Sequence, residues 1–412
     1  MQRIFSSVTP TKIIIILALL ASLLSFAKSD HCRNNGWASP DVDVHACYSD
    51  IPSLFSARGL DLHHWAYSSG EKSVEYPVIT GVVMWATAWM VASGKHSTRN
   101  YFDLNIFLLS LLFIGTLLVT FKLNPRYSYL LALSPAVIGS LFINWDLWGI
   151  FSMMLAIHFF DKNEINRSAA LLAVSISTKF FPVLLVLPII FILWRRNEIR
   201  SIVKYSSVCI AVWLTINLPV IITTPQGWWH FYQLNLQRES DWGSVWYALS
   251  LLGLNISALN YISVLLLLAV STAMVIYLLE LSRTPKLAEV SFLLLAAVLI
   301  VGKVYSPQYV LWLVPLAVIA LQSKKELLAF WIWQAGEAIY HVAIWQHLAL
   351  VSGSHFGLPD AGYACLTLVR IATCLYFMGV LMKNRLSERP PQAGDSHSRI
   401  ADFLFGSASS YP

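Results

Sequence analysis

Long apolar runs separated by short polar segments recur along almost the whole chain. An α-helix needs about 20 apolar residues to cross a bilayer. Of the 412 residues, 57% are hydrophobic and 12% are charged, against about 25% charged in a soluble globular domain. We therefore predict an all-α, polytopic membrane protein in which several spans are short. The apolar runs cover residues 13–27, 78–92, 104–121, 127–143, 147–160, 169–194, 202–222, 261–281, 290–301, 310–321, 327–350 and 364–382.

The run at 169–194 contains a lysine near its middle. This run is longer than one span requires, and Pro182 removes a helical hydrogen bond within it. A bare ammonium group in lipid costs several kcal/mol. Lys179 therefore lies at a hidden helix break or in a functional cavity, and both can hold together. We predict that the chain turns at Lys179.

The basic residues gather in short loops between the apolar runs, as the positive-inside bias predicts. The net charge of +6 therefore does not indicate nucleic-acid binding, which would need a basic stripe on a soluble face. The loop that carries Arg195, Arg196, Arg200 and Lys204 is expected to be cytoplasmic, together with both termini. These anchors predict a multi-pass protein of the plasma membrane.

Two threadings satisfy these anchors. In the first, 78–92 crosses the membrane and 169–194 crosses once, which puts the basic loops near Lys122 and Lys162 outside. In the second, 78–92 is re-entrant or lies on the surface, and 169–194 folds at Lys179 into two short spans. The second threading puts those basic loops inside and Lys179 on the outer face, with about 12 crossings, and we favour it for that reason.

The two ends of the chain raise separate questions. Residues 1–28 are either a first span or a removed signal peptide, because Arg3 and Lys12 precede a short apolar stretch with a small-residue site after it. Either outcome places the following loop outside. Residues 1–382 are expected to form the membrane domain, and the polar segment 383–412 is expected to be a disordered cytoplasmic tail.

The first outer loop, at about 28–100, mixes carboxylates with tryptophan and tyrosine. Such a mixture suits a sugar held by stacking and by hydroxyl hydrogen bonds, although a solvated loop has a similar acidic content. Position favours Asp50, because the apolar segment 51–55 after it can lie on the membrane surface and hold the carboxylate at the bilayer boundary. Cys32 and Cys47 fall in this loop and can pair.

Two further outer loops, at about 223–260 and 302–309, carry charged groups beside aromatic residues. The first contains Arg238 and Asp241, and the second contains Lys303 at the end of a span. The alternatives to a binding site are an aromatic belt at the membrane interface and a solvated loop. Arg238, Asp241 and Lys303 are therefore candidate site residues.

Polar residues also occur at or within the spans. Asn144 and Asp146 begin a span on the same side as Asp50, and the alternative to a functional role is a helix cap in the interface. Glu337 and His341 lie four residues apart on one helix face. We interpret them as a hydrogen-bonded interior pair, because a single carboxylate without a third ligand gives little support for a metal.

Several common sequence signatures are absent. The chain has no phosphate-cradling glycine loop, no GxSxG elbow, no HExxH helix and no zinc spacing, which argues against a nucleotide-driven pump and common hydrolases. No internal repeat suggests the paired halves of a transporter. We expect no cofactor, and the sparse acidic cluster disfavours the alternative of a divalent metal.

Six short motifs occur in an order that resembles actinobacterial members of glycosyltransferase family 87. These are polyprenol-phosphate-mannose-dependent mannosyltransferases of the GT-C superfamily. Each motif is weak alone, but their order covers nearly the whole chain before the tail. The resemblance implies a GT-C fold, a sugar donor linked to polyprenyl phosphate and an active site at the outer face. The motifs are Cys47-Tyr48-Ser49-Asp50, Glu75-Tyr76-Pro77-Val78-Ile79-Thr80-Gly81, Asn144-Trp145-Asp146, Lys179-Phe180-Phe181-Pro182, Arg238-Glu239-Ser240-Asp241-Trp242-Gly243-Ser244 and Val304-Tyr305-Ser306-Pro307-Gln308-Tyr309.

The resemblance also implies roles for individual residues. In that superfamily an Asp of the first outer loop is the catalytic base, and Asp50 is the matching position. A sugar phosphate already has a good leaving group, so the enzyme must neutralise the phosphate charge and remove a proton from the acceptor hydroxyl. Lys179, Arg238 and Lys303 are cations for the phosphate, and we expect Lys179 to meet a lipid phosphate rather than a protein carboxylate. The expected sugar or acceptor contacts are Glu75, Tyr76, Asn144, Asp146, Asp241, Tyr305 and Gln308.

We therefore expect an integral membrane glycosyltransferase that moves a sugar, mannose by the resemblance, from polyprenyl phosphate to a glycan or glycolipid acceptor with inversion. One rival is a secondary transporter or flippase of lipid-linked sugar, with Lys179 and Asp146 along its pathway. Another is a non-catalytic scaffold with a sugar-binding outer loop. A transporter would be expected to show half-repeats and charges near span centres, whereas the strongest charges here fall at span ends.

Overall fold

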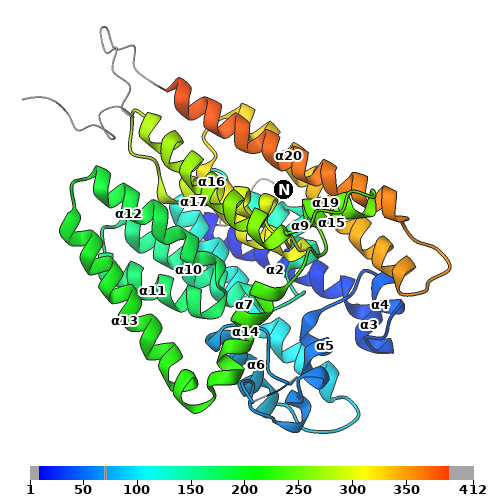
Figure 1. Ribbon diagram of the computed structural model, residues 1–412. Helices are drawn as coiled ribbons and strands as arrows, with labels where there is room; N and C mark the ends of the chain where they lie inside the picture. The colour runs from blue at the N-terminus through cyan, green and yellow to red at the C-terminus, as the bar shows by residue number, and fades with distance from the viewer. Residues whose placement is uncertain (1–8, 69, 71, 389–412) are drawn as a thin grey trace, which may run out of the picture.

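The computed structural model describes residues 9–68, 70 and 72–388, and every regular element among these residues is a helix (Figure 1). The all-α prediction is therefore confirmed. The elements are α2 (Pro10–Lys28), α3 (Asp30–Asn35), α4 (Asp41–Val44), α5 (Asp50–Ala57), η1 (Leu60–Leu62), α6 (Val78–Trp89), α7 (Ser97–Leu123), α8 (Leu130–Leu133), α9 (Pro135–Ser140), α10 (Asp146–Asp161), α11 (Ile165–Thr178), η2 (Phe181–Leu185), α12 (Val186–Arg195), α13 (Ile199–Thr223), α14 (Pro225–Gln237), α15 (Val245–Leu251), α16 (Leu259–Glu280), α17 (Leu287–Val301), η3 (Pro307–Tyr309), α18 (Val310–Ala320), α19 (Lys324–Val351) and α20 (Asp360–Ser387).

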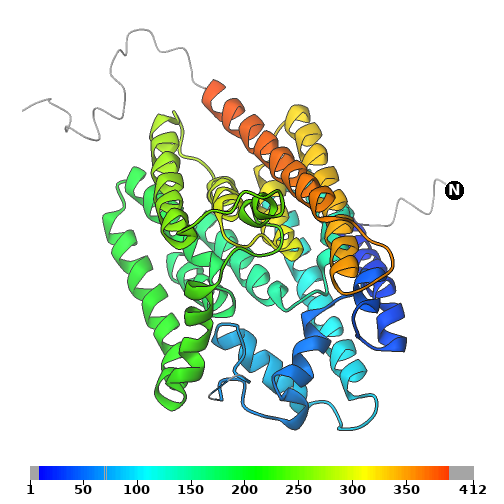
Figure 2. The same ribbon diagram turned by 45° about the vertical axis from the view of Figure 1, so that its right-hand side comes forward.

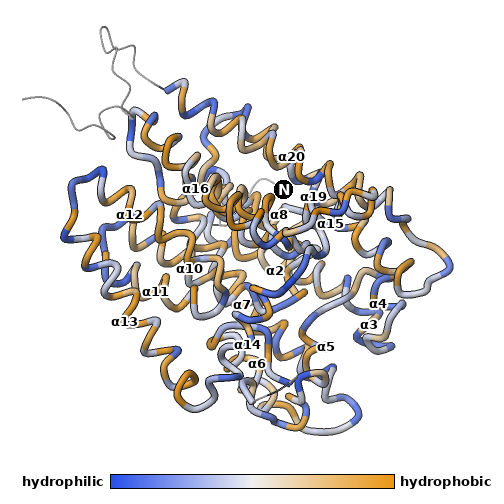
Figure 3. Tube along the Cα trace, in the orientation of Figure 1, coloured by the Kyte–Doolittle hydropathy of each residue, from blue (hydrophilic) through white to orange (hydrophobic). Residues whose placement is uncertain are grey.

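Six of these helices are long and apolar enough to cross a membrane, namely α2, α7, α13, α16, α19 and α20. Shorter apolar helices lie among them, including α6, α17 and the segments Phe181–Arg195 and Pro307–Ala320. Figure 3 shows hydrophobic residues along the helices and hydrophilic residues mainly at their ends and in the connecting loops. The chain is a multi-pass membrane protein with several short apolar helices, as predicted.

The chain turns at Lys179. Helix α11 ends at Thr178, and Lys179 has an extended backbone with φ −146° and ψ 142° before η2 begins. Pro182 is then accommodated near the start of η2, where its missing N–H removes no helical bond. The predicted hidden helix break is confirmed.

Helix α6 is too short to cross a bilayer alone. Its 12 residues extend about 18 Å at 1.5 Å per residue, against a hydrocarbon core of about 30 Å. The Thr80 hydroxyl donates to the carbonyl of Thr178 at 2.7 Å, which fixes the start of α6 beside the helix break. This length agrees with the favoured threading, in which 78–92 is re-entrant or lies on the surface.

Basic loops meet at one end of the molecule. Arg196 after α12 donates to the side chain of Asn163 between α10 and α11 (3.2 Å). Arg195 donates to the carbonyl of Arg283 between α16 and α17 (3.3 Å), and Arg283 pairs with Glu388 after α20 (2.7 Å). The two views in Figures 1 and 2 show this end opposite the α3–α6 segment. The loop near Lys162 therefore lies with the loop at 195–199, as the favoured threading requires.

At the other end, α3, α4, α5 and η1 form a small cap on the helices (Figure 2). The Cys32–Cys47 disulfide, with a Cα–Cα distance of 6.0 Å, joins α3 to the segment that leads into α5; the sequence allowed this pairing without predicting it. Ser49 caps α5 by accepting from the Ile51 N–H at 3.2 Å. The Asp50 N–H donates to the Ile143 carbonyl at 2.7 Å, so the first residue of α5 is fixed close to the start of α10.

The interior pairing of Glu337 differs from the prediction. Glu337 accepts from Arg370 Nε at 2.9 Å rather than from His341, and both side chains of this ion pair are fully buried. Arg370 also stacks on the ring of Tyr305, 3.6 Å from its centroid. An acidic residue inside a membrane bundle needs a cation, and the sequence spacing of four residues pointed to the wrong partner.

The first residues of the predicted tail are part of a helix. Helix α20 continues to Ser387, so residues 383–387 are helical. Residues 389–412, which make up the rest of the predicted tail, lie outside the described residues. At the other end, α2 runs without interruption through residues 25–27, where a cleavage site was considered, to Lys28.

The Arg370–Glu337 pair gives a stability prediction. Arg370→Met leaves a carboxylate buried without its cation, which costs about 3–5 kcal/mol, so thermal unfolding in detergent should occur at a clearly lower temperature. Arg167→Met is the control, because Arg167 is 69% exposed in its pair with Glu164 and such surface pairs contribute about 0–1 kcal/mol. Equal melting temperatures for the two variants would contradict this account.

Candidate functional site

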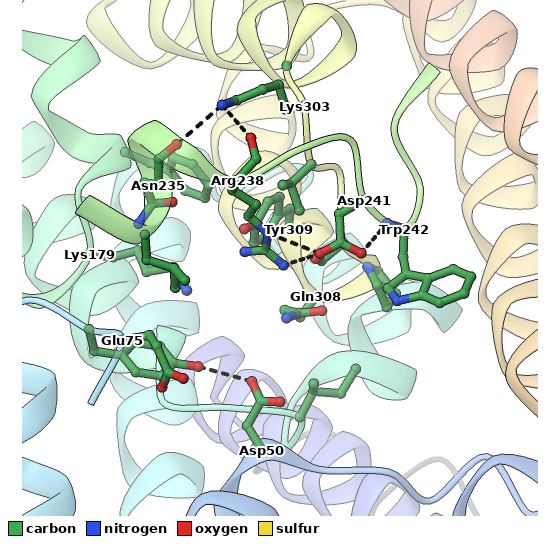
Figure 4. Close-up of a pocket in the computed structure, with 18 of the residues that line it drawn as sticks. Asp50, Glu75, Lys179, Asn235, Arg238, Asp241, Trp242, Lys303, Gln308 and Tyr309 are labelled. Atoms are coloured by element: carbon green, nitrogen blue, oxygen red, sulfur yellow. Dashed lines mark hydrogen bonds and ion pairs between the residues drawn. The ribbon is translucent and has the colours of Figure 1, made fainter. Parts of the chain in front are cut away.

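A cavity of about 1040 Å³ lies at the end of the molecule that carries the cap. Its wall comes from the start of α5, the segment before α6, the helix break at Lys179, α14 with the loop after it, the turn between α17 and α18, and the last turns of α19. Figure 4 shows Asp50, Glu75 and Lys179 along one side of this space and Arg238 and Asp241 across from them. Segments that are far apart in the sequence therefore converge on one site.

Asp50 presents a carboxylate that two phenols hold in place. Tyr48 donates to Oδ1 at 2.9 Å and Tyr76 donates to Oδ2 at 3.0 Å. Burial raises the pKa of Asp50, whereas the two hydroxyls and the charge of Lys179 act to lower it. The position at the first turn of α5 also favours the ionised form through the helix dipole. Asp50 can thus act as an oriented base.

Lys179 is paired with a carboxylate, contrary to the expectation that its partner is a ligand phosphate. Its Nζ lies 3.0 Å from Asp146 Oδ1. It also lies over the rings of Tyr76 and Tyr309, 4.8 Å and 5.7 Å from their centroids. An ammonium group has three N–H donors, so the ion pair leaves donors for a group in the cavity.

Asp146 is a positioning residue behind the wall. Its side chain is 1% exposed, and Trp312 Nε1 donates to its Oδ2 at 2.9 Å. A Cβ at Gly149 would lie 2.7 Å from the Trp312 ring, so glycine at this position allows the indole to reach Asp146. Asn144 Oδ1 accepts from the Asp146 N–H at 3.0 Å, a local bond just before α10, whose cap residue is Trp145.

Arg238 and Asp241 form an ion pair on the opposite wall. Arg238 donates through Nε at 3.0 Å and also through Nη2 to Asp241 Oδ2. The Trp242 N–H donates to Asp241 Oδ1 at 2.6 Å, and the Asp241 N–H donates to the Lys303 carbonyl at 2.9 Å. These bonds fix the guanidinium at the cavity while its Nη1 makes no hydrogen bond to another described residue.

Lys303 has a structural role that the sequence did not predict. Its Nζ donates to the carbonyls of Arg238 (2.6 Å) and Asn235 (3.3 Å) and to Asn260 Oδ1 (2.6 Å). A cation at this position also suits the C-terminal end of α14. Partial burial, with Arg238 nearby, lowers the pKa of Lys303. Lys303 lines the cavity but is already engaged with the backbone.

Two polar side chains on the wall differ in whether they already have a hydrogen-bond partner in the protein. Glu75 accepts from Arg58 Nε at 3.0 Å, so its carboxylate is oriented and neutralised. The Gln308 side chain lies near the centre of the view in Figure 4 and makes no hydrogen bond to the described residues. Gln308 therefore offers a donor and an acceptor to a ligand.

The structure brings most of the predicted site residues together. Three lie outside the wall: Asn144 and Asp146 are buried behind Lys179, and Tyr305 is buried with its hydroxyl 3.2 Å from Glu337 Oε1. None of these three is positioned to contact a ligand in the cavity. The predicted residues that line it are Asp50, Glu75, Tyr76, Lys179, Arg238, Asp241, Lys303 and Gln308.

Three contributors were missed. Tyr48 donates to Asp50 and lies only two residues before it. Its closeness in the sequence to the candidate base is the signal that could have indicated it. Tyr309 lies in a quoted motif, and its ring meets the Lys179 ammonium. Trp312, which orients Asp146, lies in an uninterrupted apolar run and gives no sequence signal.

Much of the remaining wall is apolar. Aromatic and aliphatic side chains of α14, α17 and α19 face the space next to the charged groups. A ligand with a charged head and a long hydrocarbon chain would match both parts. The apolar side chains are Trp229, Phe231, Leu234, Leu236, Val298, Leu299, Ile344 and Leu348.

The contacts of Lys303 predict that this lysine orders the 235–242 segment. Lys303→Met removes the ammonium that bonds the carbonyls of residues 235, 236 and 238 and the side chain of Asn260, so local opening should become about 1–2 kcal/mol easier, or roughly 5–30-fold in the opening constant. Hydrogen exchange of the 235–242 amides measures this change. The exposed Lys95→Met is the control, and unchanged exchange in Lys303→Met would contradict the structural role.

No protein-family model matches this chain, and no curated protein sequence matches it. Among solved structures, it is similar to the crystal structure of ArnT from Cupriavidus metallidurans bound to undecaprenyl phosphate. The identity is 14%, the alignment covers 92% of this chain and 78% of that chain, and the TM-score is 0.46. A likeness at this level leaves the activity of this chain to be argued from its own residues.

Proposed function

We propose that this protein is a membrane glycosyltransferase that moves a sugar from a polyprenyl-phosphate donor to a glycan or glycolipid acceptor. The observation that supports this most strongly is the placement of Asp50, held by Tyr48 and Tyr76, together with Lys179 and Arg238 in one half-apolar cavity. A base and phosphate-binding cations are the groups that such a transfer needs. The order of the sequence motifs supports the same assignment.

The base in this mechanism is Asp50. It accepts the proton of the acceptor hydroxyl while that oxygen attacks the anomeric carbon and the bond to the phosphate oxygen breaks. An attack in line with the departing phosphate inverts the anomeric centre. The raised pKa of Asp50 suits this role, because a base that is too acidic accepts a proton poorly.

The departing phosphate is stabilised by Lys179 and Arg238. Both cations are already fixed by carboxylates, Lys179 by Asp146 and Arg238 by Asp241, so they need little reorganisation when charge develops. Each keeps at least one N–H that is not used in its ion pair. Lys303 supports this wall indirectly, because it holds the backbone around Arg238.

The sugar and the acceptor would lie between these groups and the polar wall. Glu75, Gln308 and Asp241 offer hydroxyl-binding atoms, and the Tyr76 ring offers an aromatic face beside Asp50. The lipid tail would follow the apolar side chains of α14 and α17. The assignment of mannose rests on the family resemblance alone.

The proposed orientation places the cavity at the outer face. The loops that carry Arg195, Arg196 and Arg283 lie together at the opposite end of the helices, and the positive-inside bias makes that end cytoplasmic. The disulfide in the cap suits an oxidising compartment on the cavity side. Both chain ends would then be cytoplasmic.

Transfer of label from radiolabelled polyprenyl-phosphate mannose tests the function. Membranes with the wild-type protein should label glycan acceptors, and Asp50→Asn should reduce the rate by about 100-fold or more, because it removes the general base. The exposed Asp30→Asn is the matched control. Equal transfer by Asp50→Asn would remove Asp50 as the base, and no transfer by well-folded wild type with this donor would contradict the mannosyl donor.

The hydrogen bond from Tyr48 predicts a shift in the pH profile. Tyr48→Phe removes a donor that favours the Asp50 carboxylate, so the pKa of Asp50 should rise further. Because the base must be ionised, the acidic limb of kcat/KM should move to higher pH. Tyr376→Phe, an exposed tyrosine, should leave the limb in place, and an unchanged limb in Tyr48→Phe would argue against Asp50 as the titrating base.

A further inference from the structure

Two histidines and an aspartate meet on the cap, away from the polar groups of the cavity. His31 Nε2 lies 2.8 Å from Asp41 Oδ2, and His45 Nδ1 lies 3.1 Å from Asp41 Oδ1. One ligand atom from each of these side chains lies within 4.8 Å of the others. The two imidazole rings are stacked, with centroids 3.5 Å apart. All three side chains keep part of their surface in solvent.

The fold builds this cluster from two short helices. His31 lies in α3, whereas Asp41 begins α4 and His45 follows its last residue, so one helical turn puts Asp41 and His45 side by side. The Cys32–Cys47 disulfide fixes the two halves, because one cysteine adjoins His31 and the other follows His45 by two residues. The ligand atoms are therefore brought together by the fold and not by a local motif.

We propose that His31, Asp41 and His45 bind a divalent transition metal ion of the zinc class. Two imidazoles and a carboxylate are a ligand set of open zinc sites, with bonds of about 2.0–2.2 Å and a fourth position for water. Ligand atoms in such a tetrahedron lie about 3.4 Å apart. Here one ligand atom from each side chain lies within 4.8 Å of the others, and the two imidazoles approach different oxygens of Asp41, at 2.8 and 3.1 Å. Magnesium and calcium prefer all-oxygen sites, so two imidazoles disfavour them.

Asn35 lies against the side of the His31 ring that faces away from Asp41. Its Nδ2 donates to the His31 carbonyl at 3.1 Å and lies 3.4 Å from His31 Nδ1. This contact helps to hold His31 in the cluster while its Nε2 faces Asp41.

The ion would connect the cap to the rim of the cavity. Helix α4 carries Asp41 to the cluster and Asp43 to the cavity, where Asp43 Oδ2 accepts from the Ser352 hydroxyl at 3.0 Å. An ion that holds α4 against α3 would therefore also restrain the part of the cavity rim formed by Asp43 and by the segment that follows α4, which contains Tyr48 and Asp50. The ion would be structural, and its binding does not depend on the proposed transferase activity.

Calorimetric titration of the tag-free full chain in detergent with Zn²⁺ tests this inference. The wild type should bind one ion per chain, and Zn²⁺ should raise its melting temperature. The double variant His31→Ala/His45→Ala should lose more than about 100-fold in affinity, because it removes two of the three ligands. His355→Ala, an exposed histidine of another loop, is the matched control.

If the double variant is unstable, Asp41→Asn replaces it in the test, because asparagine keeps the shape of the side chain. Asp41→Asn should weaken Zn²⁺ binding by at least about tenfold. Each variant is accepted only if its melting temperature without metal matches the wild type and the disulfide remains closed. Co²⁺ bound to the wild type should show the visible bands of a tetrahedral site. The proposal would be overturned if the wild type showed no saturable Zn²⁺ binding. It would also be overturned if Asp41→Asn and the double variant bound Zn²⁺ as tightly as the wild type.

Discussion

The buried ion pair between Lys179 and Asp146 is the interaction on which the site depends. It joins the C-terminal end of α11 to the N-terminal end of α10, where the ammonium and the carboxylate each meet the helix end of opposite partial charge. The Asp146 carboxylate is removed from solvent, the Lys179 side chain keeps only 13% of its surface exposed, at the cavity, and Trp312 supplies a further donor to the carboxylate. Without Asp146, the Lys179 ammonium would be an unpaired charge at a helix break inside a membrane protein, which is strongly unfavourable.

The pair also sets the geometry of the cavity. It holds the ammonium between the rings of Tyr76 and Tyr309, and Tyr76 in turn donates to Asp50. A short chain of contacts thus connects the proposed phosphate site to the proposed base. A cation held by a carboxylate also occurs on the opposite wall, where Asp241 orients Arg238. The Lys303 ammonium orders the backbone around these two residues.

The sequence was informative where one physical constraint acted alone. A lysine and a proline in a long apolar run predicted the break at Lys179, and the positions of basic residues predicted which loops share an end. The placement of Asp50 on the cavity wall was also predicted, whereas the pairing of Cys32 with Cys47 was left open by the sequence. These features follow from desolvation of charge and from chain chemistry, both of which are local in the sequence.

Partnerships between distant segments were not predictable. Lys179 was expected to meet a ligand phosphate, Glu337 was expected to pair with His341, and Tyr305 was expected in the site. In the structure Lys179 instead forms an ion pair with Asp146, and Glu337 forms one with Arg370. The Arg370 guanidinium stacks on the ring of Tyr305. Each of these outcomes depends on packing between helices that are far apart in the chain. The His31, Asp41 and His45 cluster was missed for the same reason, because two helices and a disulfide create it.

The central claim is that the paired Lys179 binds the phosphate of a lipid donor. Binding of polyprenyl phosphate to purified protein in detergent, measured for wild type and Lys179→Met, tests it most directly. The account predicts that Lys179→Met melts at a lower temperature, because Asp146 loses its cation, and that it loses most of its affinity at temperatures where it is folded, while Lys95→Met binds like the wild type. Retained affinity in a folded Lys179→Met protein would contradict the claim and leave Lys179 as a structural partner of Asp146.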